Sequence, residues 1–376
     1  MIDPNSLKLL KDEITERIKA DRAILDQLRK EIQPLKSNVH KIQPRNTTSI
    51  SLVGTDGGNN QVQFDPFLVQ IIRVVDSSNN EYCLEAITPT TKVSQLTARQ
   101  FNSDGSSKTA LGEMMLDLGV KQLTELSHMI RNNDNDQPTS PSWVQVYREL
   151  VEWAILYSVI KKDFGTDTLI VFDGLLRSKV FAKELFKKYR ENLGKMIEKQ
   201  DKEKRRKIFL VGLAKHSKVL SRYRLTMALE NILNCNYPAY VEIPQDIEEK
   251  AYVWAEYARG QDTEGEVNKY VAGKMYFVKF GNGPRDPIWP VDIFMPQTSQ
   301  AQAILGCLLA DAINGFPIPF YPLCLQKAHE NAALVDFDFD ILQDQIFEGI
   351  RNVLGSESPK LDTFHLQDKD PSQKRY

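Results

Sequence analysis

The chain has 376 residues, of which 41% are hydrophobic and 26% are charged, and its formal net charge is −2. This balance is typical of a folded protein, and the apolar runs fall short of the roughly 18 residues that span a bilayer. A membrane protein, a collagen-like chain and a fully disordered chain are therefore excluded. The small net charge also argues against a protein that coats nucleic acid by charge alone, although a basic channel and acidic metal ligands would cancel in the sum.

The cysteines indicate a reducing compartment. They are scattered along the chain and form no CxxC pair, so neither a zinc ribbon nor a disulfide framework is expected. The start, Met1-Ile2-Asp3-Pro4, lacks the basic and apolar regions of a secretory signal. We expect a cytoplasmic protein with no membrane contact.

Residues 6–33 predict an amphipathic helix that ends before Pro34. Its apolar residues recur at intervals of three, four and seven: Leu7, Leu10, Ile14, Ile18, Leu25, Leu28 and Ile32. Such a stripe fits a helix packed on its own domain or a short coiled coil with a second copy of the chain. We assign residues 1–44 to an N-terminal helical docking segment.

The next elements predict an α/β protein. Strands are expected at 49–53, 67–75, 82–87, 168–173 and 208–212, and helices at 109–131, 142–162 and 178–206, with a loop at 131–142. Three strands, a helix, a strand, a helix and a strand, in that order, are the layout of an RNase H-like fold, a mixed sheet flanked by helices.

Further elements complete this domain. Strands near 275–280 and 291–295 and helices near 299–314 and 339–354 close the core. Residues 45–354 are thus assigned to one domain, and residues 355–376 to a polar tail that we expect to be disordered.

Two acids occupy comparable places in the predicted sheet. Asp56 and Asp173 each follow an apolar strand and each precede a glycine. A lone Asp-Gly is more often a simple turn, but acids at the carboxyl ends of strands lie at the edge where sites form. Two carboxylates brought together there repel unless a cation lies between them, and Mg²⁺ or Mn²⁺ takes such oxygen ligands.

A helix can supply a third acid. Glu152 lies in the apolar run Leu150–Leu156, where a charge is costly unless it is paired or bound to metal. Pairing with a buried arginine or lysine is the alternative. Glu149, on the same helix face, and Glu113, on the preceding helix, are the other candidates for this ligand.

Three more residues have the chemistry of a phosphate site. Lys215 follows the strand at 208–212 and can stabilise developing negative charge on a phosphate. Tyr321 and His329 are eight residues apart, about two helical turns, so both can face one groove. A histidine there can bind a second metal or move a proton. Arg177 is a further candidate for phosphate contact, with a solvated surface charge as the alternative.

Four motifs, taken in order, resemble the NurA nuclease family. They are Gly54-Thr55-Asp56-Gly57-Gly58, Val171-Phe172-Asp173-Gly174-Leu175-Leu176-Arg177, Gly212-Leu213-Ala214-Lys215-His216-Ser217, and Tyr321-Pro322 followed by Ala328-His329. The resemblance covers roughly residues 45–350. It departs from the family in the first motif, which reads Asp-Gly-Gly where Asp-Gly-Ser is usual.

The resemblance implies an RNase H-like, Mn²⁺-dependent DNA nuclease, with Mg²⁺ as the other possible metal. It implies 5′–3′ exonuclease and endonuclease activity, a homodimer, and a HerA-type hexameric translocase as partner in end resection and repair. Carried over by motif, Asp56, Asp173 and His329 match the metal-site residues and Tyr321 matches the accompanying tyrosine, whereas Glu152 matches by placement only. The chain has no GxxxxGK[ST] motif, so the motor would be a separate protein.

The mechanism we expect is two-metal phosphodiester hydrolysis. Asp56 bridges the metals, Asp173 and Glu152 complete their ligand shells, His329 assists at the second site and Lys215 steadies the phosphate. The alternative is a non-catalytic RNase H-like module that binds nucleic acid or a translocase.

Overall fold

The computed structural model describes residues 3–45, 48–54, 61–64, 67–88, 90–139, 142–252, 269–333 and 336–358. Asp56, the bridging ligand of the expected mechanism, lies outside these residues, as does most of the polar tail at 355–376. In the described part of the chain, no helix has the length and apolar character needed to cross a membrane.

The described strands form one mixed sheet. They are β1 (His40–Lys41), β2 (Thr48–Gly54), β3 (Gln61–Phe64), β4 (Phe67–Asp76), β5 (Glu81–Ile87), β6 (Thr168–Asp173), β7 (Ile208–Leu213), β8 (Ala239–Glu242), β9 (Gly273–Lys279) and β10 (Ile288–Phe294). The spatial order is β1-β8-β9-β10-β7-β6-β2-β4-β3, with β5 beside β4.

The centre of this sheet has the RNase H-like order. β5, β4 and β2 pair antiparallel, and β2, β6 and β7 pair parallel. The predicted fold class, a mixed sheet flanked by helices, is therefore confirmed. β8, β9 and β10 extend the sheet beyond β7 through antiparallel pairs.

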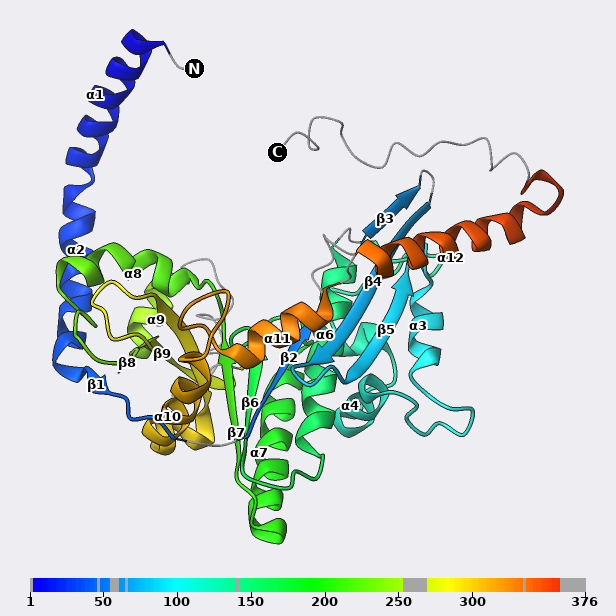
Figure 1. Cartoon of the computed structure of the whole chain (residues 1–376). Helices are drawn as coiled ribbons and strands as arrows, with labels where there is room; N and C mark the ends of the chain where they lie inside the picture. The colour runs from blue at the N-terminus through cyan, green and yellow to red at the C-terminus, as the bar shows by residue number, and fades with distance from the viewer. Residues whose placement is uncertain are drawn as a thin grey trace.

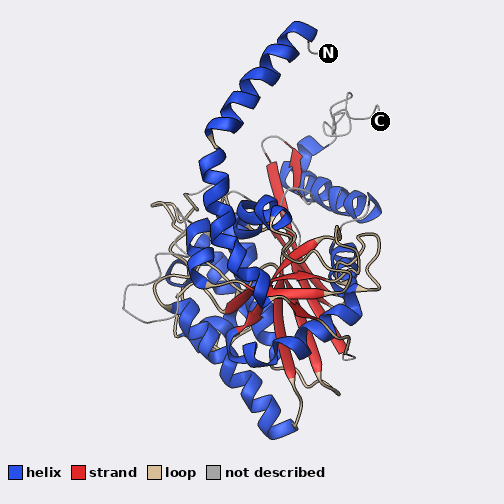
Figure 2. Cartoon of the chain, turned by 90° about the vertical axis from the view of Figure 1, so that its left-hand side faces the viewer, coloured by secondary structure: helices blue, strands red, loops and turns tan. Residues whose placement is uncertain are grey.

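Helices cover both faces of the central strands (Figures 1 and 2). On one face, Ile170 and Phe172 of β6 belong to a core with residues of α6 (Trp143–Ile160) and α7 (Leu185–Lys204). On the other face, Leu169 and Val171 belong to a core with residues of α10 (Ala301–Ala312) and α11 (Leu323–Ala332). Alternate side chains thus enter opposite cores, which explains why these strands read as continuous apolar runs.

Apart from the N-terminal α1 and α2, further helices are described. They are α3 (Val93–Arg99), α4 (Ala110–Leu118), α5 (Leu123–Leu126), α8 (Lys218–Leu229), α9 (Gln245–Ala251) and α12 (Asp336–Leu354), with the 3₁₀ helices η1 (Gln33–Asn38) and η2 (Met295–Gln300). The single helix predicted at 109–131 is wrong. α4 ends at Leu118 because Gly119 takes a left-handed conformation, with φ of 76°, that stops the helix.

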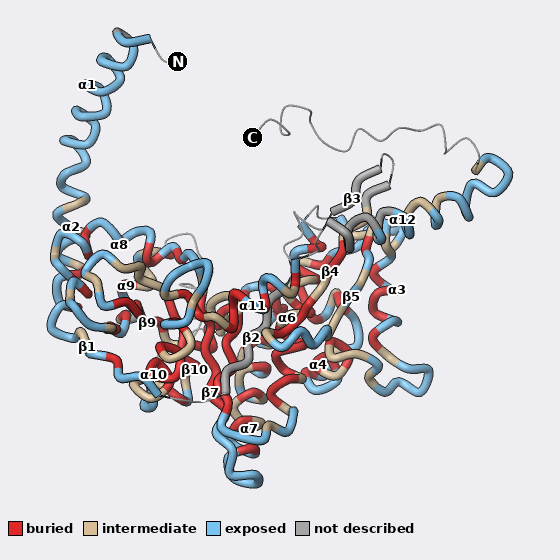
Figure 3. The backbone as a smooth tube through the Cα atoms, in the orientation of Figure 1, coloured by how far each residue is buried: buried red, intermediate tan, exposed pale blue. Residues whose placement is uncertain are grey.

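The N-terminal helix is present but divided. α1 (Pro4–Ala20) extends away from the rest of the chain (Figures 1 and 3). The following helix, α2 (Arg22–Ile32), packs against α8. The apolar residues of α1 are exposed, whereas Ile32 and the following Leu35 are buried in a core shared with α8. β1 then joins the sheet edge beside β8.

Arg177, in the segment that follows β6, forms a buried ion-pair cluster. Its guanidinium donates two hydrogen bonds to Asp292 of β10, at 2.8 and 2.6 Å, and one to Glu248 of α9, at 2.7 Å. The side chain is almost inaccessible to water, so Arg177 is neither a phosphate contact nor a solvated surface charge, the two roles considered from the sequence. The cluster instead ties the segment after β6 to two elements far away in the sequence.

Arg177→Met tests this interpretation. It leaves Asp292 and Glu248 buried without their cation, so we expect a loss of about 3–5 kcal/mol in the free energy of unfolding. Urea denaturation of the metal-free chain measures it. The matched control is Arg17→Met, which removes an exposed pair with Glu13 on α1 and is expected to leave stability nearly unchanged. Equal effects of the two substitutions would contradict the role assigned to Arg177.

Candidate functional site

A cavity of about 460 Å³ at the carboxyl end of β6 brings together four of the predicted site residues. They are Asp173, Lys215, Tyr321 and His329. Its other lining residues are Phe316, Pro317, Ile318, Leu325, Gln326 and Glu330. Residues separated by more than 150 positions in the sequence thus share one concave site.

The parallel pairing of β6 and β7 explains why two of these residues meet. Asp173 is the last residue of β6 and lies opposite Leu213 of β7, so the loop that carries Lys215 leaves the same sheet edge. Gly174 has a φ of 132° and donates its backbone N–H to the carbonyl of Leu213, at 2.9 Å. Few other residues adopt this conformation, so the glycine turns the chain away directly after the carboxylate.

Helix α11 and the residues directly before it bring the other two. The helix begins after Pro322, carries His329 and packs along β2, β4 and β6. The side-chain amide of Asn331 donates to the carbonyl oxygen of Asp76, at 3.2 Å, which fixes the helix to the end of β4. Tyr321 and His329, eight positions apart, therefore line the same cavity.

Burial and neighbouring charges act on Asp173 in opposite directions. Burial raises its pKa, and the charges of Lys215 and His329 and a hydrogen bond from Tyr321 oppose that rise without cancelling it. The phenol Oη donates to the Asp173 carboxylate at 3.4 Å, a long contact. Burial raises the pKa of Tyr321 as well, so the phenol stays protonated and able to donate.

Aromatic and cationic contacts position the tyrosine. Its ring packs edge-on against Trp289 of β10, with the ring centroids 4.9 Å apart. Lys215 Nζ lies 5.7 Å from the centroid of the Tyr321 ring. Tyr321 is buried, whereas Lys215 and His329 are exposed on the cavity wall. The site thus has a half-buried carboxylate and a buried phenol beside two accessible basic side chains.

The helix glutamates lie outside the cavity wall. Glu152 pairs with Arg148 one turn earlier on α6, at 3.2 Å, which is the alternative considered from the sequence. Glu113 pairs with Lys161 at 2.8 Å. None of the three candidate glutamates is among the residues that line the cavity.

Glu149 is half-buried and hydrogen-bonded. Burial raises its pKa, while hydrogen bonds from Ser178 Oγ, at 2.5 Å, and Trp153 Nε1, at 3.4 Å, oppose the rise. The positive charge of Arg148 lowers the pKa of both Glu149 and Asp173, so this part of α6 lies within electrostatic range of the cavity. A helix glutamate as metal ligand stays a prediction.

The donor set suits a hard divalent cation only in part. Asp173 offers carboxylate oxygens and His329 an imidazole nitrogen, ligands that Mn²⁺ accepts. Among the described residues, however, no group of three or more histidine, cysteine, aspartate and glutamate side chains is placed to hold a metal ion. Asp56 lies outside those residues. The strand that leads to it, β2, pairs parallel with β6, with Leu52 opposite Phe172.

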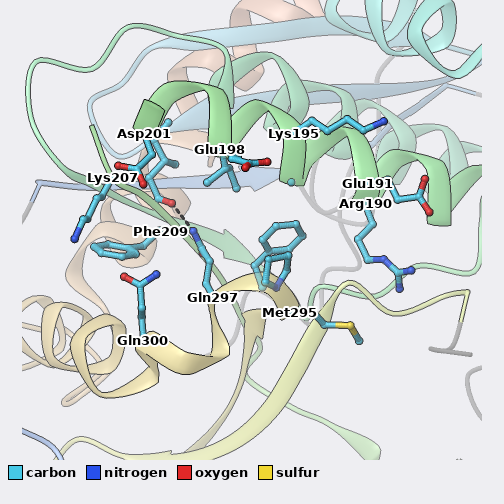
Figure 4. Close-up of a pocket in the computed structure, with 15 residues that line it drawn as sticks. Arg190, Glu191, Lys195, Glu198, Asp201, Lys207, Phe209, Met295, Gln297 and Gln300 are labelled. Carbon is cyan, nitrogen blue, oxygen red and sulfur yellow. Dashed lines mark hydrogen bonds between the residues drawn. The ribbon is translucent and has the colours of Figure 1, made fainter. Parts of the chain in front are cut away.

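A second cavity, of about 760 Å³, lies at the opposite end of the parallel strands (Figure 4). It is lined by one side of α7, by the start of β7 and by η2. Gln297 donates to the carbonyl of Ile208, at 2.6 Å, and accepts from the N–H of Leu210, at 2.9 Å. None of the predicted site residues lines this larger cavity, and its glutamine is engaged with the sheet backbone.

Sequence reasoning missed the apolar wall of the first cavity. Phe316, Pro317 and Ile318 line it, directly before Tyr321. The available signal was the run Gly315-Phe316-Pro317-Ile318-Pro319-Phe320, whose prolines indicate a fixed, non-helical turn.

Comparison with known proteins finds likeness in structure alone. No protein-family profile and no curated protein matches the sequence. Among solved structures, the chain is similar to the NurA nuclease from Sulfolobus solfataricus, with 13% identity, a TM-score of 0.46, and coverage of 95% of this chain and 98% of that chain. It is also similar to a NurA bound to dAMP and manganese, with 11% identity, a TM-score of 0.41, and coverage of 86% and 94%. A further NurA structure gives 12% identity, a TM-score of 0.43, and coverage of 94% and 99%. At these values the likeness carries no argument about activity.

The raised pKa of Asp173 predicts a stability effect of Asp173→Asn. A group whose pKa is higher in the folded than in the unfolded chain stabilises the fold only while it is protonated. This contribution to the free energy of unfolding is lost as pH rises through the folded pKa. The charge therefore opposes folding near neutrality. We expect Asp173→Asn to melt at a higher temperature than the wild type in EDTA at about pH 7, with the difference shrinking towards about pH 4.

Asp76→Asn is the control with the opposite sign. Burial opposes the charge of Asp76 at the end of β4, but hydrogen bonds from Asn80, Tyr82 and Ser78 outweigh burial and lower its pKa. That stabilisation is present above the unfolded pKa and lost as pH falls through the folded pKa, so Asp76→Asn is expected to melt lower at about pH 7. If Asp173→Asn also melts lower, the electrostatic interpretation of Asp173 is wrong.

Proposed function

We propose that the chain is a divalent-cation-dependent nuclease of the NurA type that hydrolyses phosphodiester bonds of DNA. The observation that carries the proposal is the cavity in which Asp173, Lys215, Tyr321 and His329 meet, at the carboxyl edge of the parallel strands of an RNase H-like sheet. The ordered sequence motifs that resemble this family include all four residues.

Each residue has a role that its surroundings support. Lys215 is exposed on the wall and can bind a phosphate oxygen and stabilise the charge that develops there. His329, also exposed, can bind a cation or pass a proton to the leaving oxygen. Tyr321 orients the Asp173 carboxylate through its phenol and is itself fixed by Trp289.

Asp173 and His329, together with Asp56 and a glutamate of α6, would hold Mn²⁺ or Mg²⁺. When bound, such a cation supplies Lewis-acid activation of water and neutralises phosphate charge. Burial of Asp173 supports this assignment, because a carboxylate whose charge is disfavoured gains most from a nearby cation.

The partners belong to the same proposal. A HerA-type translocase would supply the motor that this chain lacks, in DNA end resection and repair, with 5′–3′ cutting and a homodimer as the working form. The exposed apolar stripe of α1, which includes Leu7, Leu10, Ile14 and Ile18, supports a docking or dimerisation role for this helix. A cytoplasmic location is consistent with these partners.

The rival function is a non-catalytic module that binds nucleic acid or a translocase. It is favoured by the lack of a three-ligand group among the described residues. The two functions differ in the response to metal: a nuclease with a cation site is expected to melt at a higher temperature with Mn²⁺ than with EDTA. A binding module without that site would show no change.

Digestion of end-labelled single- and double-stranded DNA with Mn²⁺, Mg²⁺ or EDTA tests the activity. We expect Asp56→Ala and Asp173→Asn to abolish cutting, because each removes a carboxylate ligand, and Lys215→Met to lower kcat by about 100-fold. Lys218→Met is the matched control, since this exposed lysine begins α8 and is not among the cavity's lining residues. Undiminished cutting by Asp173→Asn, or no metal-dependent cutting by the wild type, would contradict the proposal.

A further inference from the structure

One wall of the catalytic cavity is apolar and faces the solvent. Phe316, Pro317 and Ile318 form it, opposite in chemistry to the wall with Lys215 and His329. The side chain of Phe316 is 79% exposed, and among the large hydrophobic residues of the described chain only Val353 on α12 is more exposed. Exposing an aromatic ring to water is unfavourable, and a ligand that covers the ring would remove this cost.

The turn that carries Phe316 is held in one conformation by side chains beneath it. The buried Gln326 of α11 accepts a hydrogen bond from the N–H of Ile318, at 2.8 Å, and donates to the carbonyls of Ile318 and Tyr321, at 3.0 and 2.8 Å. A Cβ at Gly315 would lie 2.2 Å from the carbonyl oxygen of Tyr321, so only glycine fits at the start of the turn.

The two phenylalanines of this turn have opposite surroundings. Phe320 packs against the core formed with α10 and α11, while Phe316, four residues earlier, is left outside. The backbone of the turn is thus anchored from within, and it presents one aromatic side chain to the solvent. A turn already held in place costs little backbone ordering when a ligand covers it.

We propose that Phe316 is a stacking platform for an unpaired nucleobase of the DNA strand whose phosphate is bound at Lys215 and His329. This inference rests on the proposed nuclease function and adds the substrate form to it. A nucleotide joins an anionic phosphate to a flat aromatic base, and the cavity joins a basic wall to an exposed aromatic ring.

The proposal selects single-stranded over double-stranded DNA. Inside a duplex both faces of each base are covered by neighbouring base pairs, so no face is free to stack on Phe316. An unpaired base has free faces, and stacking on an aromatic side chain tolerates every base. Glu330, which also lines the cavity, does not oppose base binding, although it repels phosphate from its own part of the wall.

Fluorescence binding tests the platform independently of cutting. The probe is a short single strand with 2-aminopurine, titrated in EDTA so that the strand stays intact. We expect the wild type to quench the probe, and Phe316→Ala to bind about tenfold more weakly with reduced quenching. Phe316→Trp is expected to restore both. Leu225→Ala, on α8 and 61% exposed in the wild type, is the matched control for loss of an exposed apolar side chain.

A strand with one abasic residue, moved position by position, locates the stacked base. At the stacked position the abasic strand is expected to bind the wild type and Phe316→Ala equally. Equal affinity of the wild type and Phe316→Ala for the intact strand overturns the inference, as does failure of the wild type to bind it. A site that docks a protein instead of a base would give the first of these results.

Digestion assays separate the two proposals. Metal-dependent cutting with no effect of Phe316→Ala on the KM for single strands leaves the nuclease and removes the platform. Phe316-dependent binding without any cutting removes the nuclease and leaves a single-strand binding site. A raised KM for single strands in Phe316→Ala, with little change for duplex, is the result expected if both hold.

Discussion

The parallel pairing of β6 with β7 is the constraint on which the site depends. It sets Asp173 beside Leu213 and sends both following loops away from one edge of the sheet. Parallel strands in this position need cover on both faces, and the two helical layers supply it. The helix α11 that covers one face also carries His329 to that edge. Packing and placement of the cavity are thus consequences of the same arrangement.

The site combines charge conflict with rigid support. Asp173 is held where burial disfavours its charge, and the groups that relieve the conflict are those able to act on a phosphate: Lys215, His329 and the phenol of Tyr321. Behind the carboxylate, Arg177 joins the chain after β6 to β10 and α9 through buried ion pairs.

The two cavities illustrate why size alone does not identify a site. The larger one, at the start of β7, is lined by α7 and η2, and its buried glutamine serves the backbone of the sheet. The smaller one has convergent polar groups on one wall and a fixed aromatic turn on the other. A polymer of phosphates and bases matches that division of the walls.

The sequence by itself predicted the central strands and their flanking helices, and it singled out the four residues that line the cavity, because apolar runs, glycine after an acid and helical spacing are local properties. It did not predict β3, β8, α8 or α9. It predicted the buried strands at 168–173 and 208–212 nearly to the residue. It could not determine that Gly119 ends a helix expected to run on to 131, nor that Arg177 pairs inside the protein. Nor could it decide whether Glu152 binds a metal or pairs with Arg148, since both leave the same pattern of an acid in an apolar helix. Only the tertiary structure brought Phe316 beside Asp173, because contacts between distant segments depend on how the sheet and its helices pack and not on any signal within either segment.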